Sequence, residues 1–217
     1  MMATQYKHTT ILLARHGECQ GNREERFRGR IDYPLNERGL EQARDLGKAI
    51  IPFSPSAIYS SPLLRARQTA SEIADACSKN EVMIHEGLNN IYFSSWEGRL
   101  KSEIAFEYSH EWNIWLTSPE RLALPGAETL IEIQQRSFAA LKELVVKHEG
   151  TTFVLVSHRT VLKPLIAACL GIPVPYFWKI HMDTASYSVL IYDPKRGYGL
   201  FCLNQTSHLK KVVTEWI

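Results

Sequence analysis

The chain has 217 residues, of which 45% are hydrophobic and 22% charged, and its net charge is +2. This length favours one domain with a full core, and the small net charge gives no argument for a nucleic-acid partner. No apolar stretch has the length of a membrane-spanning helix, and the first residues lack the apolar run of a signal peptide. The four scattered cysteines form no C-x-x-C pair, so we expect free thiols and a cytoplasmic location.

Strand and helix patterns alternate along the chain, which is typical of an α/β fold with a largely parallel sheet. Apolar runs predict strands at 11–14, 57–60, 82–84 and 153–156, and an edge hairpin at 186–192 and 200–203. We expect a three-layer α/β/α sandwich formed by one domain, residues 1–217.

Helical spacing of apolar residues predicts four helices between these strands. The first follows Asn36 as its N-cap and ends at Pro52, and the second is opened by Ser61 and Pro62. A long helix is expected over 128–147, with Ile131, Phe138, Leu141 and Val145 on its apolar stripe. The last is expected over 161–170, and Gly171 ends it as a left-handed cap.

The segment 86–125 is less regular and rich in aromatic residues. We interpret it as an insertion of one or two helices over the sheet edge. Its aromatic side chains are expected either to form the core of the insertion, which we favour, or to form the wall of a ligand pocket. They are Tyr92, Phe93, Trp96, Trp112 and Trp115.

Two His-Arg pairs each follow a predicted strand. Arg15-His16-Gly17 follows the first strand, and His158-Arg159 follows the strand at 153–156. A single pair of this kind is more often an ordinary surface feature. Together with Arg65 at a helix start, the two pairs indicate one phosphate site, because ligands of open α/β sheets bind at the carboxyl ends of the strands. There a neutral imidazole can attack phosphorus and a second, protonated histidine can stabilise the developing charge.

Several motifs resemble those of the histidine phosphatase superfamily, in its phosphoglycerate-mutase-like branch. Arg15-His16-Gly17-Glu18 is similar to the family signature, and the later matches occur in the family's order. They lie at 32–43, 60–70, 125–129 and 156–158.

The resemblance implies a phosphoglycerate-mutase-like fold and a role for each matching residue. His16 is implied as the phosphorylated nucleophile, while Arg15, Arg65 and His158 bind the phosphate with help from Asn22. Neither a metal nor another cofactor is implied.

The segment 88–98 departs from the family pattern at one position. Asn90 stands where the family carries the acid that protonates the leaving oxygen, and an amide cannot supply that proton. Glu86, Glu97 and Glu128 are candidates for a substitute, with Glu128 favoured because we expect it in the first turn of its helix. Cys19 is interpreted as a small neutral replacement within the signature.

Three functions remain open at this point. The first is hydrolysis of a small phosphate monoester through phospho-His16. The second is a phosphoglycerate-mutase-type transfer, ranked lower because the insertion carries few basic residues, namely Arg99, Lys101 and Arg121. The third, motivated by Asn90, is phosphate-ligand binding or regulation with little catalysis. We expect a small phosphorylated substrate and no nucleic-acid or membrane partner, and we leave a homodimer and a substrate contact by Arg159 open.

Overall fold

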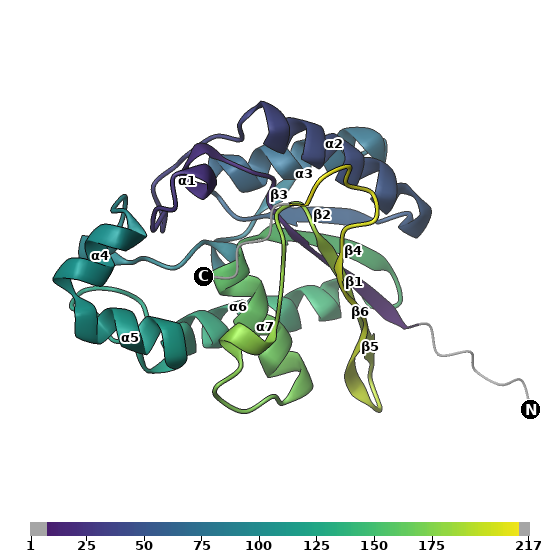
Figure 1. Cartoon of the computed structure of the whole chain (residues 1–217). Coiled ribbons are helices and arrows are strands. Elements are labelled where there is room, and N and C mark those ends of the chain that lie inside the picture. The colour runs from purple at the N-terminus through teal and green to yellow at the C-terminus, as the bar shows by residue number, and fades with distance from the viewer. Residues whose placement is uncertain (1–7, 213–217) are drawn as a thin grey trace, which may run out of the picture.

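The computed structural model describes residues 8–212, which form one mixed sheet flanked by helices (Figure 1). The six strands lie in the order β3-β2-β4-β1-β5-β6. Their bounds are β1 Thr9–Arg15, β2 Ala57–Ser60, β3 Met83–Ile84, β4 Thr152–Ser157, β5 Tyr187–Asp193 and β6 Gly197–Gln205.

The sheet is parallel except at one edge. β1 pairs in parallel with β4, β4 with β2, and β2 with β3. β5 runs antiparallel to β1, and β6 antiparallel to β5, as the expected hairpin. Thus the carboxyl ends of β1, β2 and β4 lie at the same end of the sheet, and the prediction of a mostly parallel sheet is confirmed.

Alternating side chains of β1 face two separate apolar layers. Ile11 and Leu13 pack with the apolar residues of α6 (Leu130–Lys147) and α7 (Arg159–Leu170). Leu12 and Ala14 pack with those of α2 (Glu37–Ile50) and α3 (Leu64–Ala76). Figure 1 shows these two helix pairs on opposite faces of the sheet. Because a strand presents successive side chains to opposite faces, one apolar strand supports both layers, and the three-layer sandwich is confirmed.

Two helices begin later than the sequence pattern predicts. The side chain of Asp32, distant in sequence, accepts a hydrogen bond from the backbone N–H of Leu64 at 2.6 Å, so α3 starts at Leu64 and not at Pro62. The long helix α6 starts at Leu130, with Thr129 as its N-cap and Glu132 completing a capping box.

The shift of α6 corrects two expectations. Glu128 precedes the N-cap and is therefore outside the helix. Ile131, expected on the apolar stripe, is half exposed, while its neighbours Leu130 and Ile133 are buried. The predicted caps of the other two helices are confirmed: Asn36 caps α2 through the N–H of Gly39, and Gly171 takes a left-handed conformation after α7. However, α7 begins at Arg159, two residues before the predicted start.

The aromatic segment forms α4 (Lys101–Glu107) and α5 (Ser109–Thr117), which lie beyond the carboxyl end of β1 in Figure 1. Trp96 and Trp115 are among the largest fully buried side chains. The ring of Phe27, from the loop after α1 (Gln20–Arg23), packs against both of them. The favoured interpretation as a core is confirmed for Phe93, Trp96 and Trp115, with Trp112 packed against them, and is wrong for Tyr92, which is exposed. This core lies beside the end of the sheet where the two histidines emerge, and Phe93 and Trp115 also line the pocket there.

Candidate active site

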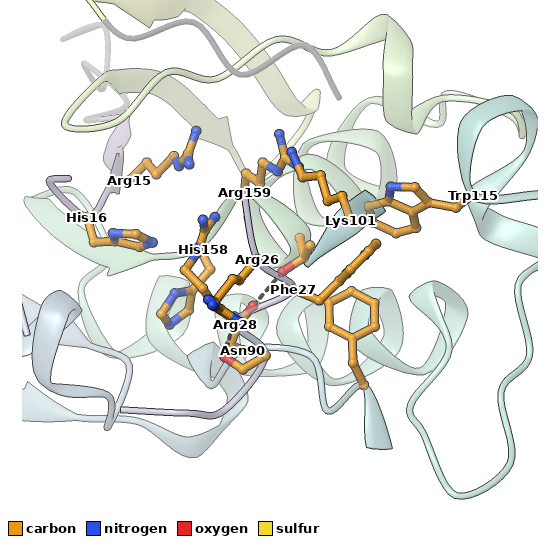
Figure 2. Close-up of a pocket in the computed structure, with 13 residues that line it drawn as sticks. Arg15, His16, Arg26, Phe27, Arg28, Asn90, Lys101, Trp115, His158 and Arg159 are labelled. Atoms are coloured by element: carbon orange, nitrogen blue, oxygen red, sulfur yellow. Dashed lines mark hydrogen bonds between the residues drawn. The ribbon is translucent and has the colours of Figure 1, made fainter. Parts of the chain in front are cut away.

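A pocket opens where β1 and β4 end and the aromatic segment crosses over them. Its cavity volume is about 40 Å³, which is small beside the usual range for small-molecule sites. Figure 2 shows the residues that line it. They are Arg15, His16, Arg26, Phe27, Arg28, Gly29, Asn90, Phe93, Lys101, Trp115, His158, Arg159 and Thr160.

His16 is held as a neutral imidazole with one defined tautomer. Its ring is buried, and Nδ1 lies 2.7 Å from the carbonyl oxygen of Gly17. Because a carbonyl only accepts, Nδ1 carries the proton and Nε2 keeps its lone pair. Burial and the charges of Arg65 and Arg15 hold the pKa of His16 well below its usual 6.5. The ring therefore has the electronic state of a nucleophile at neutral pH.

His158 lies beside His16, with 5.1 Å between the ring centroids. Its Nε2 shares a hydrogen bond of 2.8 Å with the hydroxyl of Ser61. Burial and the charge of Arg65 also hold the pKa of His158 well below 6.5. This histidine is therefore neutral in the free protein, whereas a protonated one is expected from the sequence. Its Nδ1 is buried and has no hydrogen-bond partner within residues 8–212.

Two buried arginines fix the positive charge around this pair. Arg15 lines the pocket, and its Nη1 donates to the carbonyl of Met182 at 2.7 Å. Arg65 donates through Nη1 and Nη2 to the carbonyls of Ile31 and Gly29, both at 2.9 Å. Desolvation lowers the pKa of Arg65 to about 10, which leaves the guanidinium charged at neutral pH. Arg65 is not among the residues that line the pocket, so the structure places its charge behind the histidines.

A sharp turn at Gly29 links these groups to the wall of the pocket. Gly29 has φ +51°, and a Cβ there would lie 1.9 Å from the carboxylate of Glu97. That carboxylate accepts hydrogen bonds from the backbone N–H groups of Arg30 and Phe93. Gly29 is thus required both by its backbone conformation and by a close approach, and Glu97 holds this turn rather than facing the pocket.

The pocket is more basic than the sequence motifs indicate. Beyond Arg15 and Arg159, its lining includes Arg26, Arg28 and Lys101. None of these three was placed in the site from sequence, although the alternating arginines of 26–30 were a visible signal. The charge of Arg28 also contributes to the lowered pKa values of both histidines.

Asn90 lies in the pocket wall and both ends of its amide are bonded. Its Nδ2 donates to the carbonyl of Gly29 at 2.7 Å, and its Oδ1 accepts from the hydroxyl of Thr160. Since the Gly29 carbonyl only accepts, the amide nitrogen must face it. Asn90 therefore occupies the expected position in the pocket but has no proton to give.

The expected substitute acid, Glu128, does not reach the pocket. One oxygen accepts from Arg30 at 2.7 Å and the other from Arg136 at 3.0 Å, and the backbone N–H of Tyr92 adds a third bond. These contacts use the charged carboxylate, and Glu128 is absent from the pocket lining. The expectation of a proton donor at Glu128 is corrected accordingly. Glu86 also lies elsewhere, bonded to the side chain of Asn89.

The remaining residues of the signature stabilise its backbone. The buried carboxylate of Glu18 accepts from the side chain of Asn36 at 2.8 Å. The amide oxygen of Asn22 accepts from both the backbone N–H and the thiol of Cys19. Asn22 and Cys19 are buried and do not line the pocket. The contacts of these three residues thus hold the turn that presents His16.

Two negative findings apply to residues 8–212. No helix in this range combines the length and apolarity needed to cross a membrane. The same range contains no group of three or more His, Cys, Asp or Glu side chains arranged to hold a metal ion.

The chain is similar over almost its whole length to known phosphatases. It is 34% identical to phosphoserine phosphatase 1 from Hydrogenobacter thermophilus over 206 residues, covering 94% of this chain and 96% of the relative. It is 34% identical to a metal-independent phosphoserine phosphatase from Arabidopsis thaliana over 159 residues, covering 72% of this chain and 67% of the relative.

The solved structure of Bacillus stearothermophilus YhfR superposes with a TM-score of 0.87 at 31% identity, covering 92% of this chain and 98% of that structure. The family model of the histidine phosphatase superfamily (branch 1) matches residues 11–204. The chain therefore belongs to the histidine phosphatase superfamily (branch 1), and its buried histidine pair in a basic pocket agrees with this membership.

Proposed function

We propose that this protein is a metal-independent phosphatase that hydrolyses a small phosphate monoester through a phosphohistidine on His16. One observation carries the proposal: the hydrogen bond from Nδ1 of His16 to Gly17 leaves Nε2 unprotonated inside a pocket lined by cations. The names of the phosphoserine phosphatases that the chain resembles support the same reaction class.

The reaction proceeds in two displacements at phosphorus. In the first, Nε2 of His16 forms a bond to phosphorus as the bond between phosphorus and the leaving oxygen breaks, and that oxygen keeps the bonding pair and takes up a proton from solvent. In the second, a water oxygen attacks phosphorus, the N–P bond breaks with its electron pair returning to Nε2, and the water proton is released to solvent. Inorganic phosphate leaves, and the imidazole is again neutral.

The surrounding groups bind the phosphate and stabilise its charge. Arg15 faces the pocket as a charged donor, and the charge of Arg65 acts on the same space from behind the histidines. The buried Nδ1 of His158 gains an acceptor when a phosphate oxygen approaches, which relieves roughly 1–3 kcal/mol of unsatisfied hydrogen bonding. The negative charge of a bound phosphate also raises the pKa of His158, whereas the charges of the arginines lower it. Asn22 supports the site by holding the turn after His16.

The test is release of inorganic phosphate from small phosphate esters in the presence of a chelator. His16→Ala is expected to abolish release, and a quench that avoids acid, in which the P–N bond is labile, should trap one phosphoryl group per wild-type chain. His110→Ala serves as the control, because His110 is exposed on α5 and outside the pocket. Release that survives His16→Ala would contradict the proposal.

The two alternatives have separate outcomes in the same assay. Efficient interconversion of 2- and 3-phosphoglycerate would favour the mutase, although the relatives named above are phosphatases. Tight phosphate binding with no trapped phosphoryl group would favour a binding protein, which Asn90 motivates.

The organisation of the chain remains part of the proposal. We take residues 1–217 as one phosphatase domain in which the insertion at about 86–125 faces the substrate. Phe93, Lys101 and Trp115 support this, since they bring the insertion to the pocket wall. A cytoplasmic location and a homodimer stay predictions.

A further inference from the structure

The half of the pocket away from the histidines combines aromatic rings with additional cations. Figure 2 shows Arg15 and His16 on one side of the pocket, and Lys101, Phe27 and Trp115 on the other. Lys101 lines this pocket, and so does Arg159, whose guanidinium carbon lies 5.8 Å from the centroid of the Trp178 ring. Arg26 also lines it, but its Nε donates to the carboxylate of Glu24 at 2.6 Å, which offsets its charge. Orthophosphate at His16 would not reach all of these groups, so the rest of a larger substrate would lie against them.

The same pocket contains no carboxyl group. Within residues 8–212 neither an aspartate nor a glutamate lines it. Glu97 and Glu128 are bonded elsewhere, and the amide of Asn90 is held at both ends. The hydroxyl proton of Thr160 is directed to Asn90. The usual means of protonating a departing alkoxide is therefore missing from the described pocket.

We propose that the substrate is a phosphate monoester of a weakly basic hydroxyl, a phenol or an enol, that carries a second anionic group such as a carboxylate. This inference rests on the proposed function and adds the substrate class. Two independent observations support it. The lack of an acid selects a leaving group that departs unprotonated, and the positive charge of Lys101 on the far side attracts a negative charge on that group.

The first displacement then balances without a proton donor in the protein. Nε2 of His16 forms the N–P bond as the bond from phosphorus to the leaving oxygen breaks. That oxygen keeps the bonding pair and departs as an oxyanion, which takes a proton from solvent. The rings of Phe27, Phe93 and Trp115 offer an apolar wall to the planar part of such a leaving group.

Two matched pairs of probes test the two parts of the inference. Phenyl phosphate and benzyl phosphate share a ring but differ in the basicity of the leaving oxygen. We expect kcat/KM to be about 100-fold or more higher for phenyl phosphate, because general acid catalysis is worth roughly 10²–10⁴-fold. 4-Carboxyphenyl phosphate and its methyl ester differ in charge, and we expect the carboxylate to be favoured by about 10-fold, which corresponds to about 1.4 kcal/mol.

Two lysine variants assign the charge preference. Lys101→Met should reduce the ratio of carboxylate to methyl ester several-fold, whereas Lys142→Met, which removes an exposed lysine of α6 outside the pocket, should leave this ratio unchanged. A loss with Lys101→Met that is larger for benzyl than for phenyl phosphate would identify Lys101 as a proton donor and overturn the inference.

The remaining outcomes separate this inference from the proposed function. Equal rates for phenyl and benzyl phosphate, or equal rates for the carboxylate and its ester, overturn the inference while the phosphatase stands. Failure of every probe to release phosphate in a manner dependent on His16 rejects the phosphatase and the inference with it.

Discussion

Replacing Asn90, whose amide supplies no proton, by aspartate should introduce a proton donor into the pocket. In the wild-type protein Nδ2 of Asn90 donates to the carbonyl of Gly29 at 2.7 Å. Asparagine and aspartate have almost the same shape, so Asn90→Asp puts a carboxyl oxygen at that place. An ionised oxygen there would meet a second acceptor and no proton, whereas the protonated form restores the hydrogen bond.

The energetic consequence can be worked from this one contact. Leaving two buried acceptors facing each other costs roughly 1–3 kcal/mol, and a pKa unit corresponds to about 1.4 kcal/mol. The pKa of the new carboxyl should therefore rise by about one to two units from its ordinary value near 3.9. The cations of the pocket act in the opposite direction, but they are spread over its walls, whereas the Gly29 carbonyl is in direct contact.

The assay is kcat/KM for benzyl and phenyl phosphate between pH 4 and pH 8. Asn90→Asp should raise the rate on benzyl phosphate by roughly 100-fold at the acidic end, since general acid catalysis contributes at least that factor, and the gain should fade as pH rises through the new pKa. Phenyl phosphate should gain much less. Asn90→Leu is the control that removes the amide without adding an acid.

Stability provides a second readout of the same reasoning. A carboxyl whose pKa is raised by folding binds its proton more tightly in the folded state, so its contribution is intact below pH 4 and is lost as pH rises. Relative to wild type, the free energy of unfolding of Asn90→Asp should fall by about 1–3 kcal/mol as pH rises from below 4 through the raised pKa of the new carboxyl. The reasoning is refuted if Asn90→Asp gains no more than Asn90→Leu on benzyl phosphate, or if both esters gain equally.

Three further predictions concern the surroundings of the site. Gly29→Ala should reduce both activity and thermal stability sharply, because its Cβ would lie 1.9 Å from a carboxylate oxygen of Glu97. Gly197 also has positive φ, but a Cβ there would meet nothing within 4 Å. Gly197→Ala should therefore lower the free energy of unfolding by only about 1–2 kcal/mol of backbone strain, as measured by melting. Glu128→Gln should retain kcat within a few-fold while lowering the melting temperature, since its carboxylate pairs with two arginines and does not line the pocket; a loss of 100-fold or more in kcat would restore it as the acid. Folding lowers the pKa values of His16 and His158, so the unfolded chain binds more protons below pH 6.5 and the stability of the fold decreases as pH drops. The melting temperature should therefore decrease less between pH 7.5 and pH 5.5 for His158→Gln than for wild type. An equal decrease would contradict the argument that burial lowers the pKa of His158.

The strands of the sheet, its three layers and the side chains that follow β1 and β4 were predictable from the sequence. Local patterns were sufficient because β1 and β4 are continuous apolar runs, and the residues directly after them must emerge at the same end of a parallel sheet. His16 and His158 were therefore predictable as a pair. The caps at Asn36 and Gly171 were also readable, because each depends on the residue at the helix end itself.

Which side chains share the pocket depends on contacts between segments that are far apart in the chain. Glu128 looked like a helix residue able to face the site, but Thr129 caps the helix and two arginines hold the carboxylate away. Arg26 and Lys101 reach the pocket from a loop and from the insertion, whose positions depend on packing around Phe27 and Trp115. Contacts between segments that are distant in the chain leave no periodic signal in the sequence, because each is made once and by side-chain packing. The chemistry at phosphorus was thus visible from the sequence, whereas the absence of a carboxyl from the described pocket and the surplus of cations required the fold.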